Sequence, residues 1–145
     1  MENDQLLNEP APQLEETAAP EEEAQENHVE LGKRGERAAR AFLERHGYDI
    51  LATNWTCPAG EADIIATLDG SLHFVEVKTR RGTGCGFPEE AVDQEKRQRY
   101  EGIAEYFLRG YERTDISVHF DIIAILVTGP DRAFLRMHNN AFGVE

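Results

Sequence analysis

Apolar residues recur along the chain with two periods, and these predict helices alternating with strands. Between residues 27 and 46 they return every three or four positions, which predicts an amphipathic helix. Asn27 and Glu30 have the spacing of a capping box at its start, and Gly47 ends it. Residues 88–109 repeat the helical pattern. Runs of apolar, β-branched and aromatic residues predict strands over 48–56, 61–68, 72–79, 118–127 and 133–138.

The order of these elements indicates the fold class. The chain runs helix, three strands, helix, strand, with an edge strand last. Asp69-Gly70, between the second and third strands, predicts a two-residue hairpin turn. Residues 118–127 are apolar at almost every position, which is typical of a strand buried on both faces. We therefore predict an α/β fold with a central mixed sheet flanked by helices.

Acidic charge is concentrated at the N-terminus. Residues 1–30 hold 10 acidic and no basic residues, so the other 18 acidic and 15 basic residues nearly balance within the total of −13. Residues 1–26 are rich in Glu, Pro and Ala and lack aromatics. We expect a disordered acidic tail there, ahead of a single domain over 27–145. The tail could serve solubility, compete with phosphate for the protein's own cations, or bind a protein partner.

Several function classes find no support in the sequence. No apolar run has membrane-spanning length and no secretory leader is visible, so we expect no membrane association and a cytoplasmic location. Cys57 and Cys85 lack Cys-x-x-Cys spacing and are expected to be inert, and the histidines lack the spacing of zinc ligands. No phosphate-cradling Gly-x-x-x-x-Gly-Lys loop implies ATP.

The predicted hairpin brings charged residues together on one face. Its turn places Asp63 opposite Glu76, and Glu61 opposite Lys78. Carboxylates directly opposite each other repel unless a cation lies between them, and Mg²⁺ or Mn²⁺ takes such oxygens. The other interpretation is a Glu61–Lys78 ion pair, with Asp63 and Glu76 in solvent. The opposite face is expected to pack in the core and carries Ala62, Ile64, Ala66, Val75 and Val77.

The residues Asp63 and Glu76-Val77-Lys78 resemble the PD-(D/E)XK nuclease motif, with Ala62 in the place of its proline. The predicted order of elements is similar to the core of that superfamily. The sequence more closely resembles the bacterial YraN-type proteins, uncharacterised protein family 0102, which are themselves similar to Holliday-junction resolvases. The resemblance covers residues 31–140 and rests on segments 32–38, 60–63, 74–80, 86–96 and 120–122.

This resemblance implies a restriction-endonuclease-like core and an endonuclease dependent on Mg²⁺ or Mn²⁺, acting on branched or single-stranded DNA. It implies that Asp63 and Glu76 are metal ligands and that Lys78 stabilises charge or orients water. It adds Glu36 as a helical carboxylate that completes the metal site, although spacing alone pairs Glu36 with Arg40. Action on a symmetric junction would require a homodimer.

Three groups of cations surround these residues along the chain. Because cations early in a helix oppose its dipole, a phosphate partner would explain them, although each group alone is also typical of a solvated face. Together they predict a nucleic-acid groove that reads shape rather than sequence. The alternatives to an enzyme are a non-cleaving nucleic-acid-binding module and a tail-mediated interaction protein. The predicted contacts are Lys33, Arg34, Arg37, Arg80, Arg81, Lys96, Arg97 and Arg99.

Two further features call for a structural explanation. Gly32 and Gly35 lie inside the first predicted helix, where each costs about 1 kcal/mol relative to Ala, so another segment is expected to approach the backbone there. Asp121 interrupts the apolar run of the fourth predicted strand. It either supports the site residues or marks the beginning of the strand.

Overall fold

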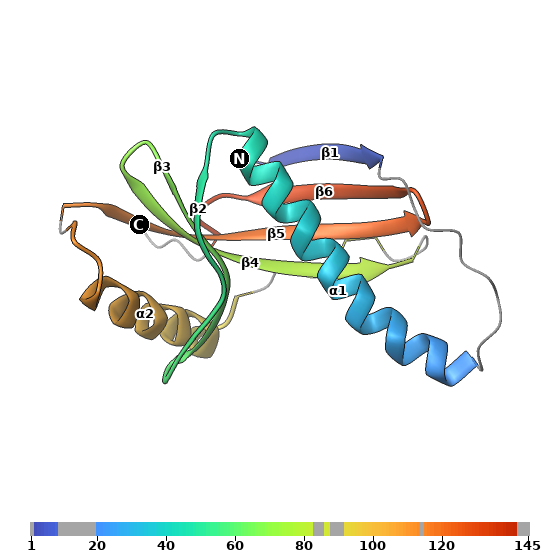
Figure 1. The fold of residues 1–145 in the computed structure, drawn as a ribbon, viewed down its shortest axis with the longest axis horizontal. Coiled ribbons are helices and arrows are strands. Elements are labelled where there is room, and N and C mark those ends of the chain that lie inside the picture. Colours follow the sequence, from blue (N-terminus) through green and yellow to red (C-terminus); the bar gives the residue numbers. More distant parts are fainter. Residues whose placement is uncertain (1, 9–19, 83–85, 88–91, 114, 142–145) are drawn as a thin grey trace.

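A six-stranded mixed sheet forms the centre of the protein (Figure 1). The computed structural model describes residues 2–8, 20–82, 86–87, 92–113 and 115–141. The sheet has the order β1-β6-β5-β4-β3-β2, in which β4 and β5 are parallel and the other neighbours antiparallel. The elements are β1 (Glu2–Asn8), α1 (Pro20–Arg45), β2 (Asp49–Cys57), β3 (Gly60–Leu68), β4 (Ser71–Arg81), α2 (Gln94–Arg109), β5 (Ser117–Gly129) and β6 (Arg132–His138).

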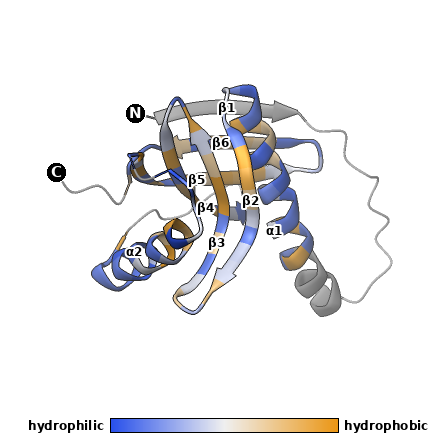
Figure 2. Cartoon of the chain, turned by 60° about the vertical axis from the view of Figure 1, so that its left-hand side comes forward, coloured by the Kyte–Doolittle hydropathy of each residue, from blue (hydrophilic) through white to orange (hydrophobic). Residues whose placement is uncertain are grey.

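The two helices pack on opposite faces of the sheet (Figure 2). Phe42 and Leu43 of α1 are buried against one face, and Tyr100 and Ile103 of α2 against the other. α2 forms the crossover that a parallel pair such as β4 and β5 requires. This arrangement confirms the predicted α/β fold with a restriction-endonuclease-like core.

The hairpin of β3 and β4 has the predicted turn and register. Asp69 and Gly70 have φ of 46° and 81°, as a two-residue hairpin turn of type I′ needs. The strands pair from Leu68–Ser71 to Ile64–Val75 and then separate. The predicted direct pairs beyond Val75, Asp63 with Glu76 and Glu61 with Lys78, are therefore wrong.

The two strands separate because each follows its other neighbour. β3 remains paired with β2 as far as Gly60, whereas β4 remains paired with β5 as far as Arg81. Figure 1 shows β2 and β3 curving away from β4 together. We call this opening between β3 and β4, next to Asp63 and Glu76, the fork.

The alternation of side chains changes at the fork. Ile64 packs in the α1 core, but Ala62 packs in the α2 core, although the two were expected to share one face. Across β2, Asn54 has a positive φ of 50° and falls between the pairs Thr53–Ile64 and Trp55–Ala62. The positive φ of Asn54 in β2 thus lies opposite the point where the side chains of β3 change face, and the predicted single apolar face is wrong at Ala62.

The N-terminal segment differs from the expected disordered tail. Residues Glu2–Asn8 form β1, which pairs with β6, and α1 begins at Pro20 instead of residue 27. A strand added to a sheet edge is held by backbone hydrogen bonds, which hydrophobic composition does not reveal. Residues 9–19 lie outside the described residues, and the proposed roles of the segment stay predictions.

Helix α2 starts later than predicted. It begins at Gln94 rather than at residue 88, and residues 88–91 lie outside the described part of the chain. Asp93 caps it, because its carboxylate accepts a hydrogen bond from the Lys96 N–H at 2.8 Å. Over the residues described, neither helix is apolar enough along its length to cross a membrane.

Candidate functional site

Four carboxylates from three elements gather at the fork. Glu61 and Asp63 come from β3, Glu76 from β4 and Glu36 from α1. Burial is the main cause that raises the pKa of Asp63 from 3.8 to about 6. The neighbouring charges of Glu36, Glu76 and Glu61 raise this pKa as well, against the effect of a hydrogen bond from Val77. Negative charge therefore exceeds positive charge around Asp63, which favours a proton or a cation there.

A hydrogen bond between the strands fixes Asp63 in the fork. Its Oδ2 atom accepts from the Val77 N–H at 2.8 Å. This bond lies just beyond Ile64 and Val75, the last backbone pair of the two strands. A side chain thus bridges the strands where the backbone ladder ends, and it holds Asp63 near Glu76.

A glycine lets α1 approach β4 beside the fork. A Cβ atom at Gly35 would overlap the side chain of Thr79, whereas one at Gly32 would meet nothing within 4 Å. The predicted close approach is therefore confirmed at Gly35 and wrong at Gly32. Since Gly35 precedes Glu36 directly, this contact brings the Glu36 carboxylate to the fork.

Glu36 has a partner at the fork that the sequence analysis missed. The Nδ2 atom of Asn54 lies 3.5 Å from Glu36 Oε1. Arg40, the alternative partner of Glu36, has its Nε atom 3.6 Å from Glu44 instead. The sequence signal for Asn54 was its place inside a predicted strand, where asparagine is uncommon. Its positive φ is a conformation that asparagine tolerates better than most residues.

Two ammonium groups flank the carboxylate of Glu76. Lys96 Nζ lies 2.8 Å from Glu76 Oε2, and Lys78 Nζ lies 3.8 Å from the same oxygen. These three side chains are largely buried, with exposures of 17% for Lys96, 24% for Lys78 and 14% for Glu76. The structure therefore places Lys78 beside Glu76, as the motif implied. Lys96, in contrast, points into the fork rather than out from the surface.

Tyr100 completes the surroundings of Glu76. It is 2% exposed and hydrogen-bonded to Glu76. Burial, followed by the charges of Glu76 and Asp63, raises the pKa of Tyr100 well above its usual range, so the hydroxyl remains protonated. The sequence signal was the spacing of four residues from Lys96, which puts both side chains on one face of α2.

The donor set of the fork suits a hard divalent cation, although the side chains do not enclose one in this arrangement. Carboxylate oxygens are the ligands that Mg²⁺ and Mn²⁺ prefer. Burial first, and the charges of Glu36, Glu76 and Glu61 second, raise the pKa of Asp63 and disfavour its uncompensated charge. Within the described ranges, no three Asp, Glu, His or Cys side chains converge closely enough to share a metal ion. Glu76 has an ammonium group as its partner instead.

Most of the predicted nucleic-acid contacts lie outside the fork. The Arg99 side chain passes Gly60 at the beginning of β3, where an added Cβ would approach its Cγ to 3.2 Å. Arg34 is half-buried on α1. Four more are exposed and close in sequence to the residues of the fork: Lys33 and Arg37 on α1, and Arg80 and Arg81 at the end of β4.

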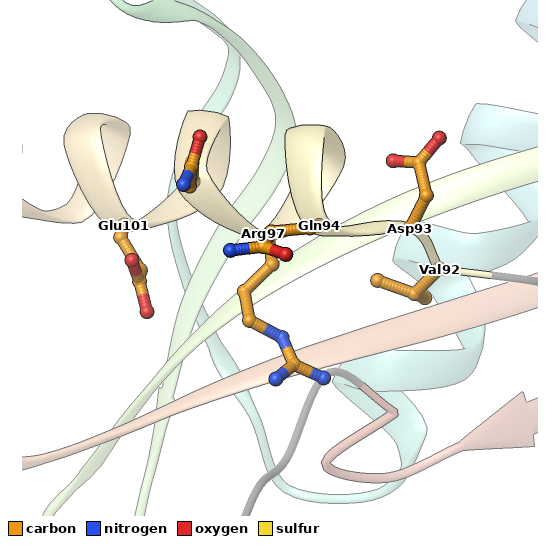
Figure 3. A pocket seen from close by; sticks show the side chains of 6 residues that line it. Val92, Asp93, Gln94, Arg97 and Glu101 are labelled. Atoms are coloured by element: carbon orange, nitrogen blue, oxygen red, sulfur yellow. The ribbon is translucent and has the colours of Figure 1, made fainter.

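A cavity of about 400 Å³ lies beside the beginning of α2 (Figure 3). The Arg97 and Asp93 side chains leave the helix in different directions. Arg97 Nε is buried and has no hydrogen-bond acceptor among the residues described. The cations of α2 thus have different surroundings: Lys96 contacts Glu76, while Arg97 lines the cavity. The lining consists of Val92, Asp93, Gln94, Arg97, Gln98 and Glu101.

A second polar group is buried in the sheet, around Asp121. Its Oδ2 lies 2.6 Å from His73 Nδ1, and its Oδ1 accepts from the Asn140 N–H at 2.6 Å. Tyr48 packs edge-on against His73, and burial together with the Asp121 charge raises the pKa of Tyr48 to about 12. Asp121 therefore links β4, β5 and the segment after β6. No sequence pattern indicated His73, since a single histidine in a strand has no distinctive spacing.

Comparisons with known proteins identify the family. The model of Uncharacterised protein family UPF0102 matches residues 35–125. A UPF0102 protein of Caldicellulosiruptor saccharolyticus is 37% identical over 117 residues, covering 80% of this chain and 99% of that protein. UPF0102 proteins of Geobacter sulfurreducens and Bacteroides thetaiotaomicron are 42% and 46% identical, covering 77% and 68% of this chain and 88% and 81% of their own. These matches confirm the resemblance, and the chain belongs to family UPF0102.

Proposed function

We propose that this protein is a metal-dependent endonuclease that hydrolyses phosphodiester bonds of DNA. The observation that carries the proposal is the gathering of Glu36, Asp63 and Glu76 at the fork, with Lys78 beside them. A structural cluster has no need of like charges held together in a half-buried place, whereas a cation site requires them. The PD-(D/E)XK-like order of these residues supports the same reaction class.

Five residues of the fork have roles in this proposal. Asp63 and Glu76 would hold Mg²⁺ or Mn²⁺, with Glu36 as a third carboxylate. The cation would supply positive charge to the phosphate and lower the pKa of a water nucleophile. Lys78 would stabilise the negative charge that develops on the phosphate oxygens. Asn54 would position Glu36, since its amide lies against that carboxylate.

The substrate in this proposal is bound through its phosphates. The exposed cations Lys33, Arg37, Arg80 and Arg81 lie next to the fork along the chain, and such contacts give affinity without choosing a sequence. Branched or single-stranded DNA fits this mode, because shape rather than base order would select it. A symmetric junction would need a homodimer to cut both strands.

The test compares the wild type with Glu76→Gln and a matched control, Glu105→Gln. Glu105 is an exposed residue of α2, paired with Arg109. Each protein is incubated with single-stranded, duplex, flapped and four-way-junction DNA in Mg²⁺, Mn²⁺ or chelator. We expect wild type and Glu105→Gln to cleave one of these substrates, and Glu76→Gln or chelator to reduce cleavage by at least about 100-fold. Full activity of Glu76→Gln would overturn the assignment.

One observation favours a second candidate, a nucleic-acid-binding module that does not cut. Glu76 already has Lys96 as an ion-pair partner at 2.8 Å, so the charge of this carboxylate is compensated without a metal. This candidate predicts DNA binding that chelator leaves unchanged, with no product from any substrate. The same incubations, followed by a gel-shift measurement, separate the two functions.

A further inference from the structure

We infer that Lys96 is an internal counter-ion of the fork, which a divalent cation must displace from Glu76 in order to bind. The inference rests on the proposed function, because it concerns the metal site proposed there. It assigns Lys96 a positioning role, in place of the surface phosphate contact that its sequence position predicted. The protein would then have two states: one with Lys96 on Glu76 and one with a metal ion there.

The geometry of the ion pair makes Lys96 a substitute for a bound cation. Its Nζ atom lies 2.8 Å from Glu76 Oε2, and its side chain is only 17% exposed. Among the described residues no closed metal-ligand group forms while this contact exists. A divalent ion on the same carboxylate oxygen would be repelled by an ammonium group in direct contact with that oxygen, as Lys96 is at 2.8 Å, so these two cations exclude each other.

Lys96 can leave Glu76 without moving the helix. Its backbone N–H is fixed by the Asp93 carboxylate at 2.8 Å, so α2 keeps its start. The flexible four-carbon stem of lysine can rotate while the backbone stays in place. Lys96 also lies at the third residue of α2, where the helix dipole disfavours a positive charge. The negative charge of Glu76 compensates for this unfavourable position of the ammonium group. A substrate phosphate could supply the same compensation once Lys96 is displaced from Glu76.

Glu76 keeps its orientation when Lys96 leaves, because other groups hold it. Tyr100 is buried and hydrogen-bonded to Glu76. Lys78 remains 3.8 Å from the same carboxylate oxygen. The fork therefore retains a placed carboxylate, and only the cation bound to it changes.

The test measures Mn²⁺ affinity by calorimetry, without DNA, for wild type, Lys96→Gln and Arg109→Gln. Arg109→Gln is a matched control because it also removes one positive charge from α2. Arg109 lies in the last turn of the helix, and its side chain is 63% exposed. We expect Lys96→Gln to bind Mn²⁺ about tenfold more tightly than wild type, since the competing ammonium is gone. Arg109→Gln should bind as wild type does. Lys96→Met, with an apolar stem, replaces Lys96→Gln if the latter does not fold.

The possible outcomes separate this inference from the proposed function. Equal or weaker Mn²⁺ binding by Lys96→Gln, with binding by the wild type, overturns the counter-ion role but leaves the metal site standing. Binding by Lys96→Gln alone would support the counter-ion role most strongly. If neither wild type nor variant binds Mn²⁺, the proposed metal site fails and the inference fails with it.

Discussion

The fork and the Asp121 pair, which consists of Asp121 and His73, are two polar groups in one sheet. Their charges are balanced in different ways. At the pair, both carboxylate oxygens of Asp121 have partners, His73 and the Asn140 N–H, within an apolar core. At the fork, Asp63 faces three other carboxylates and has a raised pKa. Satisfied polar groups stabilise a fold, whereas unbalanced ones conflict with it unless a ligand compensates. The fork, rather than the group around Asp121, is therefore the one whose charge suits a bound cation.

The largest effect is expected from breaking the balanced group. Asp121→Ala leaves the buried His73 and the Asn140 N–H without their acceptor, which should lower the free energy of unfolding by about 3 kcal/mol. Urea unfolding followed by circular dichroism measures this loss. Asp131→Ala, an exposed acidic residue between β5 and β6, is the control and should change little. A loss below about 1 kcal/mol for Asp121→Ala would contradict the structural role.

A smaller effect is expected from moving α1 away from the fork while the Asp121 pair stays intact. Gly35→Ala places a Cβ against Thr79, so stability should fall by about 2 kcal/mol as the helix shifts. Gly32→Ala is the matched control, because its Cβ meets no atom and alanine favours the helix by about 1 kcal/mol. Thermal unfolding of both variants should therefore give shifts of opposite sign. Shifts of the same sign would show that the Thr79 contact does not limit the position of α1.

The smallest effect tests the unbalanced group and should have the opposite sign to Asp121→Ala. Asp63→Asn keeps an oxygen that can accept from the Val77 N–H but removes a charge that burial and, to a lesser extent, the neighbouring carboxylates disfavour. At pH 7 the variant should be more stable than wild type by about 1–2 kcal/mol. Asp69→Asn, in the exposed hairpin turn, is the control. A destabilised Asp63→Asn at pH 7 would mean that neither burial nor the neighbouring carboxylates disfavour the charge of Asp63.

The same variant should remove a pH dependence. The pKa of Asp63 is higher in the folded protein than its ordinary 3.8, so the folded state binds more protons between pH 3.8 and about 6. The contribution of Asp63 to stability therefore falls as pH rises through this window and is constant above it. Urea unfolding at pH 4, 5, 6 and 7 should show the gain of Asp63→Asn growing across the series.

The local parts of the fold could be predicted from the sequence. Asp69-Gly70 determines the turn and, through it, the register from Leu68–Ser71 to Ile64–Val75. The apolar period also predicted both helices, and Gly35 indicated the approach of α1. These features depend on residues near one another in sequence, or on a steric rule that applies to any glycine.

The parts that could not be predicted depend on contacts between distant segments. The end of the β3–β4 ladder follows from competition with β2 and β5, and the turn residues carry no information about it. The Lys96 side chain points inward because of the way α2 lies over the sheet. The sequence around Lys96 resembles that of any basic helix start and does not indicate this direction. Likewise, β1 pairs through its backbone with a strand more than a hundred residues away.

The Asp63–Val77 hydrogen bond also makes one backbone amide a reporter of the fork. On this side of β4 the Val77 N–H is bonded to a carboxylate rather than to a carbonyl of a neighbouring strand. Its chemical shift and its rate of deuterium exchange therefore depend on where the Asp63 carboxylate lies. In a nitrogen-labelled sample, a single amide resonance would follow any change at Asp63 during a titration, with no attached probe.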